Sequence, residues 1–122
     1  MFKIQMGVPE MRDFWRLLSG KIEAGTATRD EIKQFKRLSK TLEFLQINPK
    51  HNSLSTHKID SLSEKYSVAI WCSYIQNNTP SAERLFWMYG PSRNVITILA
   101  YEKHPEDTEH GYVDLPISWP ET

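Results

Sequence analysis

The chain has 122 residues, of which 39% are apolar and 25% charged, as is typical of one ordinary globular domain. Its single cysteine excludes an intramolecular disulfide framework, and no apolar run reaches the roughly 20 residues that a membrane helix needs. The first six residues are too few and too polar for a signal peptide. We therefore expect one cytoplasmic domain, residues 1–122, that is not embedded in a membrane.

The formal net charge is zero, but the charges are unevenly distributed along the chain. Residues 1–104 carry all fifteen Lys and Arg against ten Asp and Glu, a net charge of +5. Residues 105–122 carry five acids and no Lys or Arg, so the chain ends in an acidic extension. A basic body is compatible with a polyanionic partner, although ordinary solvated surfaces give the same counts.

The first half of the chain predicts a strand and a helical hairpin. Alternating apolar residues over 2–6 indicate a short strand. Apolar residues at helical spacing over 11–22 indicate a helix that stops at Gly25. A second helix begins at the capping box Thr28–Glu31 and ends before Asn48, which is followed by proline.

The second half predicts three strands, over residues 68–75, 84–89 and 95–101, separated by turn-forming residues. Before them, residues 50–66 form a long polar connection with weak periodicity, which Leu54, Ile59 and Leu62 tether to the core. The order β-α-α-β-β-β plus a C-terminal tail predicts an α+β fold. In that fold the N-terminal helical hairpin packs on one face of a small antiparallel β-sheet.

This order resembles the RelE/ParE superfamily of bacterial toxins from type II toxin–antitoxin modules. The similarity covers most of residues 2–104 and is carried by three short motifs. These are the basic loop at His57-Lys58, the arginine that opens the third predicted strand, Arg84, and the apolar strand Val95–Ala100 followed by polar residues. In contrast with that family, this chain is neutral overall and carries the extension at 105–122.

The resemblance implies a toxin of this superfamily but does not choose between its two branches. Our first hypothesis is a RelE-like toxin, which cleaves messenger RNA on the ribosome, inhibits translation and is held inactive by a cognate antitoxin. The ParE-like branch of the superfamily instead blocks DNA gyrase and is not known as a nuclease. The alternative is therefore a non-catalytic toxin or binding module on the same fold, including a member that has lost catalysis. The sequence is compatible with a monomer or a homo-oligomer.

Cleavage of RNA by its own 2′-hydroxyl needs a base, a cation for the phosphate and an acid for the leaving oxygen. Four residues near the ends of adjacent strands are the catalytic candidates: Arg84 for the phosphate, with Tyr101, Lys103 and His104 for positive charge and proton transfer. Each has a plain alternative: Arg84 in an ion pair with Glu102, Tyr101 in the core, and Lys103 and His104 solvated. Glu102 could also act as the base.

The RNA-binding candidates are basic residues in the long connection, on the second helix and in the last turn. They are His57, Lys58, Lys36, Lys40 and Arg93. A solvated loop and a solvated helix face are the plain alternatives. We expect no cofactor and no metal site, because one cysteine and four scattered histidines lack ligand spacing. Cys72 and the tryptophans are expected to pack in the core.

Overall fold

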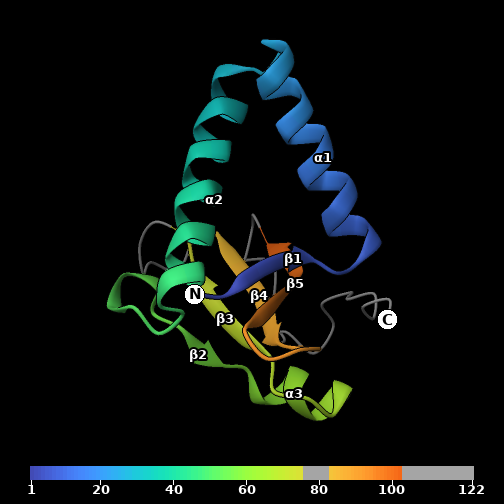
Figure 1. The fold of residues 1–122 in the computed structure, drawn as a ribbon, viewed down its shortest axis with the longest axis vertical. Helices are drawn as coiled ribbons and strands as arrows, with labels where there is room; N and C mark the ends of the chain where they lie inside the picture. Colours follow the sequence, from blue (N-terminus) through green and yellow to red (C-terminus); the bar gives the residue numbers. More distant parts are fainter. Residues whose placement is uncertain (76–82, 103–122) are drawn as a thin grey trace.

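The computed structural model describes residues 1–75 and 83–102, which form one five-stranded sheet and its helices (Figure 1). In chain order the elements are β1 (Lys3–Met6), α1 (Pro9–Ala24), α2 (Arg29–Ile47), the 3₁₀ turn η1 (Asn52–Leu54), β2 (His57–Lys58), α3 (Asp60–Tyr66), β3 (Trp71–Tyr74), β4 (Arg84–Tyr89) and β5 (Val95–Glu102). The α+β class is therefore confirmed. The predicted acidic extension, 105–122, lies outside the described residues.

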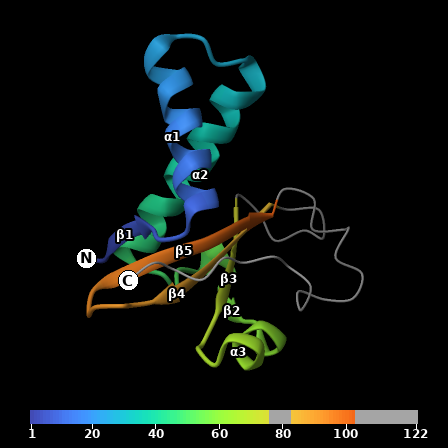
Figure 2. The ribbon, with the colours of Figure 1, turned by 90° about the vertical axis from the view of Figure 1, so that its right-hand side faces the viewer.

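The predicted helical hairpin is present, with the start and stop signals that the sequence indicated. Gly25 ends α1 in the left-handed region at φ 72°, which glycine adopts without steric cost. At the start of α2, the Thr28 hydroxyl accepts from the Glu31 amide at 3.1 Å, and the Glu31 carboxylate accepts from the Thr28 amide at 2.9 Å. The hairpin stands on one side of the sheet, and α3 lies on the other (Figure 2).

The prediction of an antiparallel sheet is wrong for the first strand. The strand order is β1-β5-β4-β3-β2, and β1 pairs with β5 in parallel, from Lys3 opposite Val95 to Met6 opposite Ile98. The remaining pairs are antiparallel, so the sheet is mixed. Alternation along the first strand indicates that it lies in a sheet, but it carries no information on the direction of its neighbour.

The connection over residues 50–66 contains structure that its weak periodicity did not predict. It holds η1, the two-residue strand β2 and the seven-residue helix α3. Elements this short cover too few turns or alternations to produce a periodic pattern. The predicted tethers are confirmed, because Leu54, Ile59 and Leu62 are all buried.

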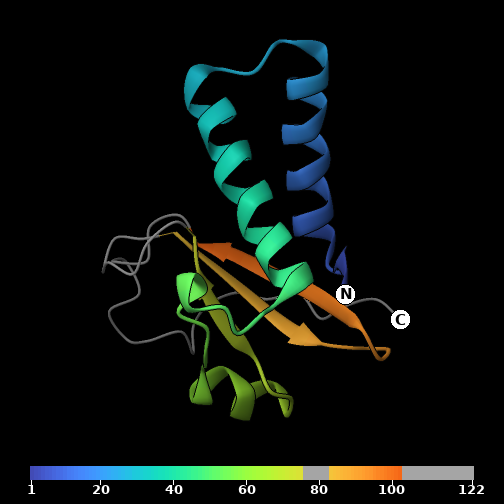
Figure 3. The same cartoon turned by 60° about the vertical axis from the view of Figure 1, so that its left-hand side comes forward.

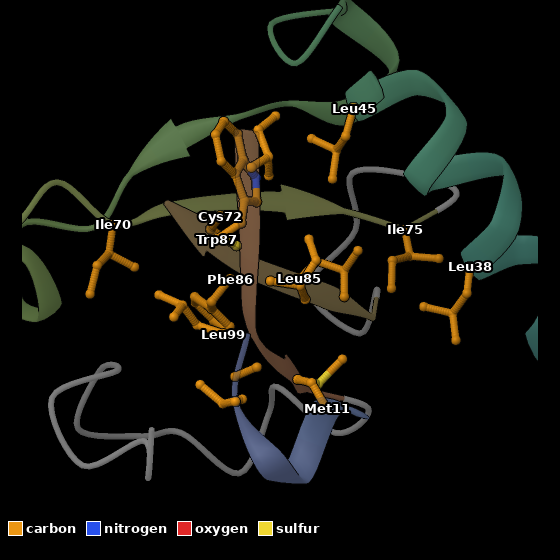
Figure 4. Packing of buried hydrophobic residues seen from close by; sticks show 14 of the residues in the cluster. Met11, Leu38, Leu45, Ile70, Cys72, Ile75, Leu85, Phe86, Trp87 and Leu99 are labelled. Carbon is orange, nitrogen blue, oxygen red and sulfur yellow. The ribbon is translucent and has the colours of Figure 1, made fainter. Parts of the chain in front are cut away.

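The core is built around β4, which is buried on both faces. Leu85, Phe86 and Trp87 are each at most 1% exposed. Figure 4 shows residues of α1, α2, β3 and β5 packed around them. Cys72 is a core residue, as predicted, and burial raises the pKa of its thiol to about 12. The Trp87 indole Nε1–H donates to the Ser73 hydroxyl at 2.9 Å, so the polar atom of this buried ring has a partner.

The two faces of the sheet differ in what covers them. Residues that alternate along a strand point to opposite faces, and residues directly opposite on neighbouring strands share a face. Leu85 is paired with Tyr101, whose ring lies 5.2 Å from that of Phe14 on α1. We call this the hairpin face, because the helical hairpin stands on this side of the sheet, with the start of α1 and the end of α2 nearest to it (Figure 3). Arg84 and Phe86 belong to the other face, here called the open face.

The helices give a matched test of this packing. Leu38 on α2 is 2% exposed, whereas Leu17 on α1 is 64% exposed. Leu38→Ala should lower the free energy of unfolding by about 2–5 kcal/mol, since it leaves a cavity under the hairpin. Leu17→Ala should change it by less than about 0.5 kcal/mol. Urea unfolding followed by circular dichroism measures both, and equal losses would contradict the placement of α2.

Candidate nucleic-acid interface

Arg84 is the first residue of β4 and lies directly across from Glu102, near the end of β5. Their side chains therefore share the open face, as the ion-pair alternative for Arg84 requires. On the other flank Arg84 is paired with Tyr74 of β3, and its guanidinium carbon lies 4.8 Å from the centre of the Tyr74 ring. This is a cation–π contact, which holds the guanidinium at the end of the sheet.

The register separates Tyr101 from Arg84. Tyr101 is paired with Leu85, one residue further along β4, so it points to the hairpin face. There its hydroxyl donates to the Glu83 carboxylate and accepts from the Gln34 amide at 3.1 Å. The structure therefore does not bring these two predicted catalytic residues together. The other two, Lys103 and His104, lie outside the described residues.

Tyr101 belongs to a polar network that joins α2 to the sheet. The guanidinium Nε of Arg37 on α2 lies 2.8 Å from Glu83, which also accepts from Tyr101. Burial, followed by the hydrogen bond to Glu83, raises the pKa of Tyr101, and the bond to Glu83 raises the pKa of Arg37. Tyr101 therefore stays protonated at neutral pH and serves as a link between the sheet and α2.

His57 reaches the open face because β2 pairs with β3. His57 is opposite Cys72, which shares its face with Tyr74 two residues along the strand. The imidazole lies edge-on to Tyr74, with 5.7 Å between ring centres. Tyr74 thus contacts Arg84 and His57, two residues that are 27 positions apart in the sequence.

The hydrogen bonding of His57 defines its tautomer. Its Nδ1 lies 3.0 Å from the backbone carbonyl oxygen of Ser55. A carbonyl oxygen only accepts, so Nδ1 carries the proton in this bond. In the neutral ring Nε2 is then the nitrogen with the lone pair, as a general base requires. His57 is an exposed residue.

Lys36 and Lys40 line a groove of about 310 Å³ between α2, η1 and the edge of β3. The other lining residues are Arg37, Thr41, Phe44, Ser53, Leu54 and Tyr74. At about 100° per residue, Lys36 and Lys40 are roughly 40° apart around α2, on the same flank of Arg37. Because Arg37 is bound to Glu83, both lysines lie beside the contact between α2 and the sheet.

Lys58 and Arg93 do not join this group. Lys58 is paired with Trp71, so it points away from His57 and Tyr74. Arg93 is exposed in the turn between β4 and β5, whereas Arg84 lies at the opposite end of β4. Of the predicted RNA-binding residues, His57 contacts Tyr74 on the open face together with Arg84. Lys36 and Lys40 lie on α2, on the hairpin side, in a groove that Tyr74 also lines at the edge of β3.

Tyr74 is the residue of this site that sequence reasoning missed. It continues the alternation of a strand that also holds Ile70 and Cys72, both fully buried, so the pattern favours a core position. It differs from them because β2 pairs only with Trp71 and Cys72 and stops before Tyr74. The proximity of the basic loop at His57-Lys58 to the start of this strand was the one available signal.

Comparisons with protein-family models, with curated proteins and with solved structures found no match for this chain. In the part of the chain that the structure describes, no helix is long and apolar enough to cross a membrane. Residues 1–75 and 83–102 likewise contain no group of three or more His, Cys, Asp or Glu that could hold a metal ion.

The Tyr101 network predicts how stability depends on alkaline pH. Folding raises the pKa of Tyr101 above the unfolded value of about 10, so the folded chain keeps a proton that the unfolded chain loses. This contribution is complete below about pH 10 and is lost as pH rises toward the folded pKa. The free energy of unfolding should therefore fall above pH 10.

Tyr101→Phe should flatten that fall, and it should also cost about 1–3 kcal/mol at pH 7 because Glu83 loses a donor. Urea unfolding between pH 7 and pH 11, with tyrosinate absorbance recorded in parallel, measures both effects. An unchanged alkaline slope in the variant would show that Tyr101 does not carry the linked proton.

Proposed function

We propose that the protein is a RelE-like toxin that binds messenger RNA as a single strand across Tyr74 and cleaves it without a metal ion. The observation that supports this is the gathering of Arg84 and His57 on one tyrosine ring, next to a groove edged by Lys36 and Lys40. An aromatic ring among cations is suited to a single strand, which offers bases to stack and phosphates to pair.

The proposed reaction is transfer of the phosphate to the neighbouring 2′-hydroxyl. His57 Nε2 takes the hydroxyl proton, the 2′-oxygen attacks phosphorus and the bond from phosphorus to the 5′-oxygen breaks. Arg84 stabilises the crowded phosphate, because its planar guanidinium offers paired donors and stays charged. An acid returns a proton to the 5′-oxygen, leaving a cyclic phosphate and a free 5′-hydroxyl. His104 remains the candidate for that acid.

The proposal assigns two kinds of partner and a cellular context. The substrate is messenger RNA, engaged on the ribosome, and the inhibitor is a cognate antitoxin protein. A protein that acts on translated messages works in the cytoplasm. The support for the antitoxin and the ribosome is the sequence resemblance, whereas the support for RNA also includes the residues around Tyr74.

A second candidate function, a non-catalytic binding module on the same fold, is favoured by the position of Tyr101. Its hydroxyl is bound to Glu83 and Gln34 on the hairpin face, away from Arg84. Tyr101, one of the predicted catalytic residues, therefore has a structural role in this contact. A member that has lost catalysis, or a gyrase-directed toxin, would keep such a structural tyrosine. In that case the protein would inhibit growth while transcripts remain intact.

Expression without an antitoxin tests the first function against the second. Transcript ends should map to discrete internal sites. Arg84→Ala should lower the cleavage rate about 10²–10³-fold and His57→Gln about 10²–10⁴-fold, because they remove charge stabilisation and the base. Arg93→Ala is the matched control for loss of one positive charge, since Arg93 lies at the far end of β4, and it should cleave near the wild-type rate.

Growth inhibition with intact transcripts would reject cleavage in favour of the binding module. A gyrase supercoiling assay would then separate the gyrase-directed alternative from other targets. Equal losses in Arg84→Ala and Arg93→Ala would show that only general positive charge matters and that the contacts around Tyr74 are not the site.

The salt dependence of RNA binding tests the role of the two lysines. Each phosphate contact to a single strand adds about 0.7 to the slope of log affinity against log salt concentration. Lys36→Gln with Lys40→Gln should therefore reduce that slope by about 1.4, if each lysine neutralises one phosphate. Fluorescence anisotropy with a short labelled RNA at several salt concentrations measures it. A slope equal to that of the wild type would show that neither lysine contacts a phosphate of the RNA.

A further inference from the structure

The groove beside Tyr74 has a basic rim at Lys36 and Lys40 and is also lined by the aromatic residues Phe44 and Tyr74. Lys36 and Lys40 are exposed and four residues apart on α2, where like charges repel and destabilise a helix. Arg37 does not relieve this repulsion, because its charge is matched by Glu83. An anion bound between the two lysines would relieve it, which makes this rim a suitable site for a phosphate.

Phe44 lines the groove and is partly buried, and a neighbouring aromatic ring packs against it. The imidazole of His51 lies 4.7 Å from it, at an interplanar angle of 35°. His51 is itself fixed, because its Nδ1 accepts from the Ser53 amide at 3.0 Å in the cap of η1. A ring held in place in this way loses little conformational freedom when a second flat group stacks on it.

The size of the groove limits what can occupy it. Its volume of about 310 Å³ lies at the lower end of small-molecule sites, which run from about 300 to 1,000 Å³. That room suits one nucleotide, and it excludes a paired base, whose partner and neighbours would have to enter with it. Ser53 is exposed and lines the groove, and its hydroxyl can both donate and accept, so it suits the edge of an unpaired base.

We propose that this groove is a nucleotide subsite of the RNA site. One unpaired base stacks on Phe44 beside Ser53, and its phosphate lies between Lys36 and Lys40. This subsite rests on the proposed RNA binding. It would hold the nucleotide next to the reacting phosphate. Tyr74 makes the connection, because it lines the groove and also contacts Arg84 and His57. The strand would then pass the edge of β3 at Tyr74, so that the neighbouring phosphate reaches Arg84 on the open face.

The subsite assigns a selectivity to the protein. Bases in an A-form duplex stay stacked and paired, so only single-stranded segments can place a base on Phe44. The base must also be contiguous with the phosphate at Arg84, so a preference should appear at one fixed position relative to that phosphate. Phosphate contacts alone give no such preference, because they carry no base information.

The experiment measures binding of short single-stranded RNAs with one randomised position, using the full-length protein. Phe44→Leu keeps an apolar side chain but removes the stacking surface, and it should weaken binding at least about fivefold. It should also flatten the base preference at one position while leaving the salt slope unchanged. Leu17→Ala is the matched control, because Leu17 is an exposed apolar residue of the helical hairpin that does not line the groove, and it should bind like the wild type.

A second variant covers the outcome in which Phe44→Leu fails to fold. Ser53 is exposed, so Ser53→Trp leaves the core intact and fills the groove. It should reduce affinity at least as much as Phe44→Leu. RNA binding that is unchanged in both variants would overturn the subsite while leaving the proposed function standing. Absence of RNA binding in the wild type would reject the proposed function and the subsite together.

Discussion

The ion pair between Arg37 and Glu83 sets the geometry on which the rest of the site depends. It joins the middle of α2 to the residue immediately before β4, and Tyr101 of β5 bonds to the same carboxylate. With Glu83 directed at the hairpin, alternation along the chain directs Arg84 to the open face. The same contact fixes the rotation of α2, which leaves Lys36 and Lys40 beside the groove. Glu83 thereby helps to set the directions of Arg84, Lys36 and Lys40.

The main effect of this ion pair is to fix how α2 is oriented on the sheet, and it adds little to stability. The Arg37 and Glu83 side chains are 28% and 13% exposed, so each loses much of its hydration on folding. For pairs of this kind the cost of desolvation offsets most of the attraction. A rotation of α2 that separates Arg37 from Glu83 would leave each charge partly buried without its partner. Other rotations of α2 are therefore unfavourable. The Tyr101 bond strengthens that selection, because it requires β5 to be in register as well.

Sequence patterns were sufficient wherever a signal was local. The capping box at Thr28 and the stop at Gly25 depend on a few adjacent residues, and both were predictable. The direction of β1 was not, because the partner strand is about 90 residues away. The grouping of Arg84 with Tyr101 failed for a related reason. Both residues lie near the ends of adjacent strands, but only the register shows that they occupy opposite faces. The partial exposure of Tyr74 was not predictable either, because it depends on where β2 ends.

The overall neutrality of the chain does not conflict with binding to a polyanion, because a ligand responds to the charges near it. Exposed charges more than about 8 Å apart are largely screened at physiological salt. Within the described site, Arg37 and Glu83 cancel each other, while Lys36 and Lys40 remain on the rim and Arg84 lies on Tyr74 with Glu102 across from it. A phosphate that approaches Arg84 therefore meets a guanidinium that is already oriented by an aromatic ring, and it must also approach a carboxylate. The carboxylate weakens the binding of a phosphate at Arg84, while the aromatic ring keeps the guanidinium in one orientation. In the proposed reaction, a fixed orientation is what stabilisation of a single phosphate requires.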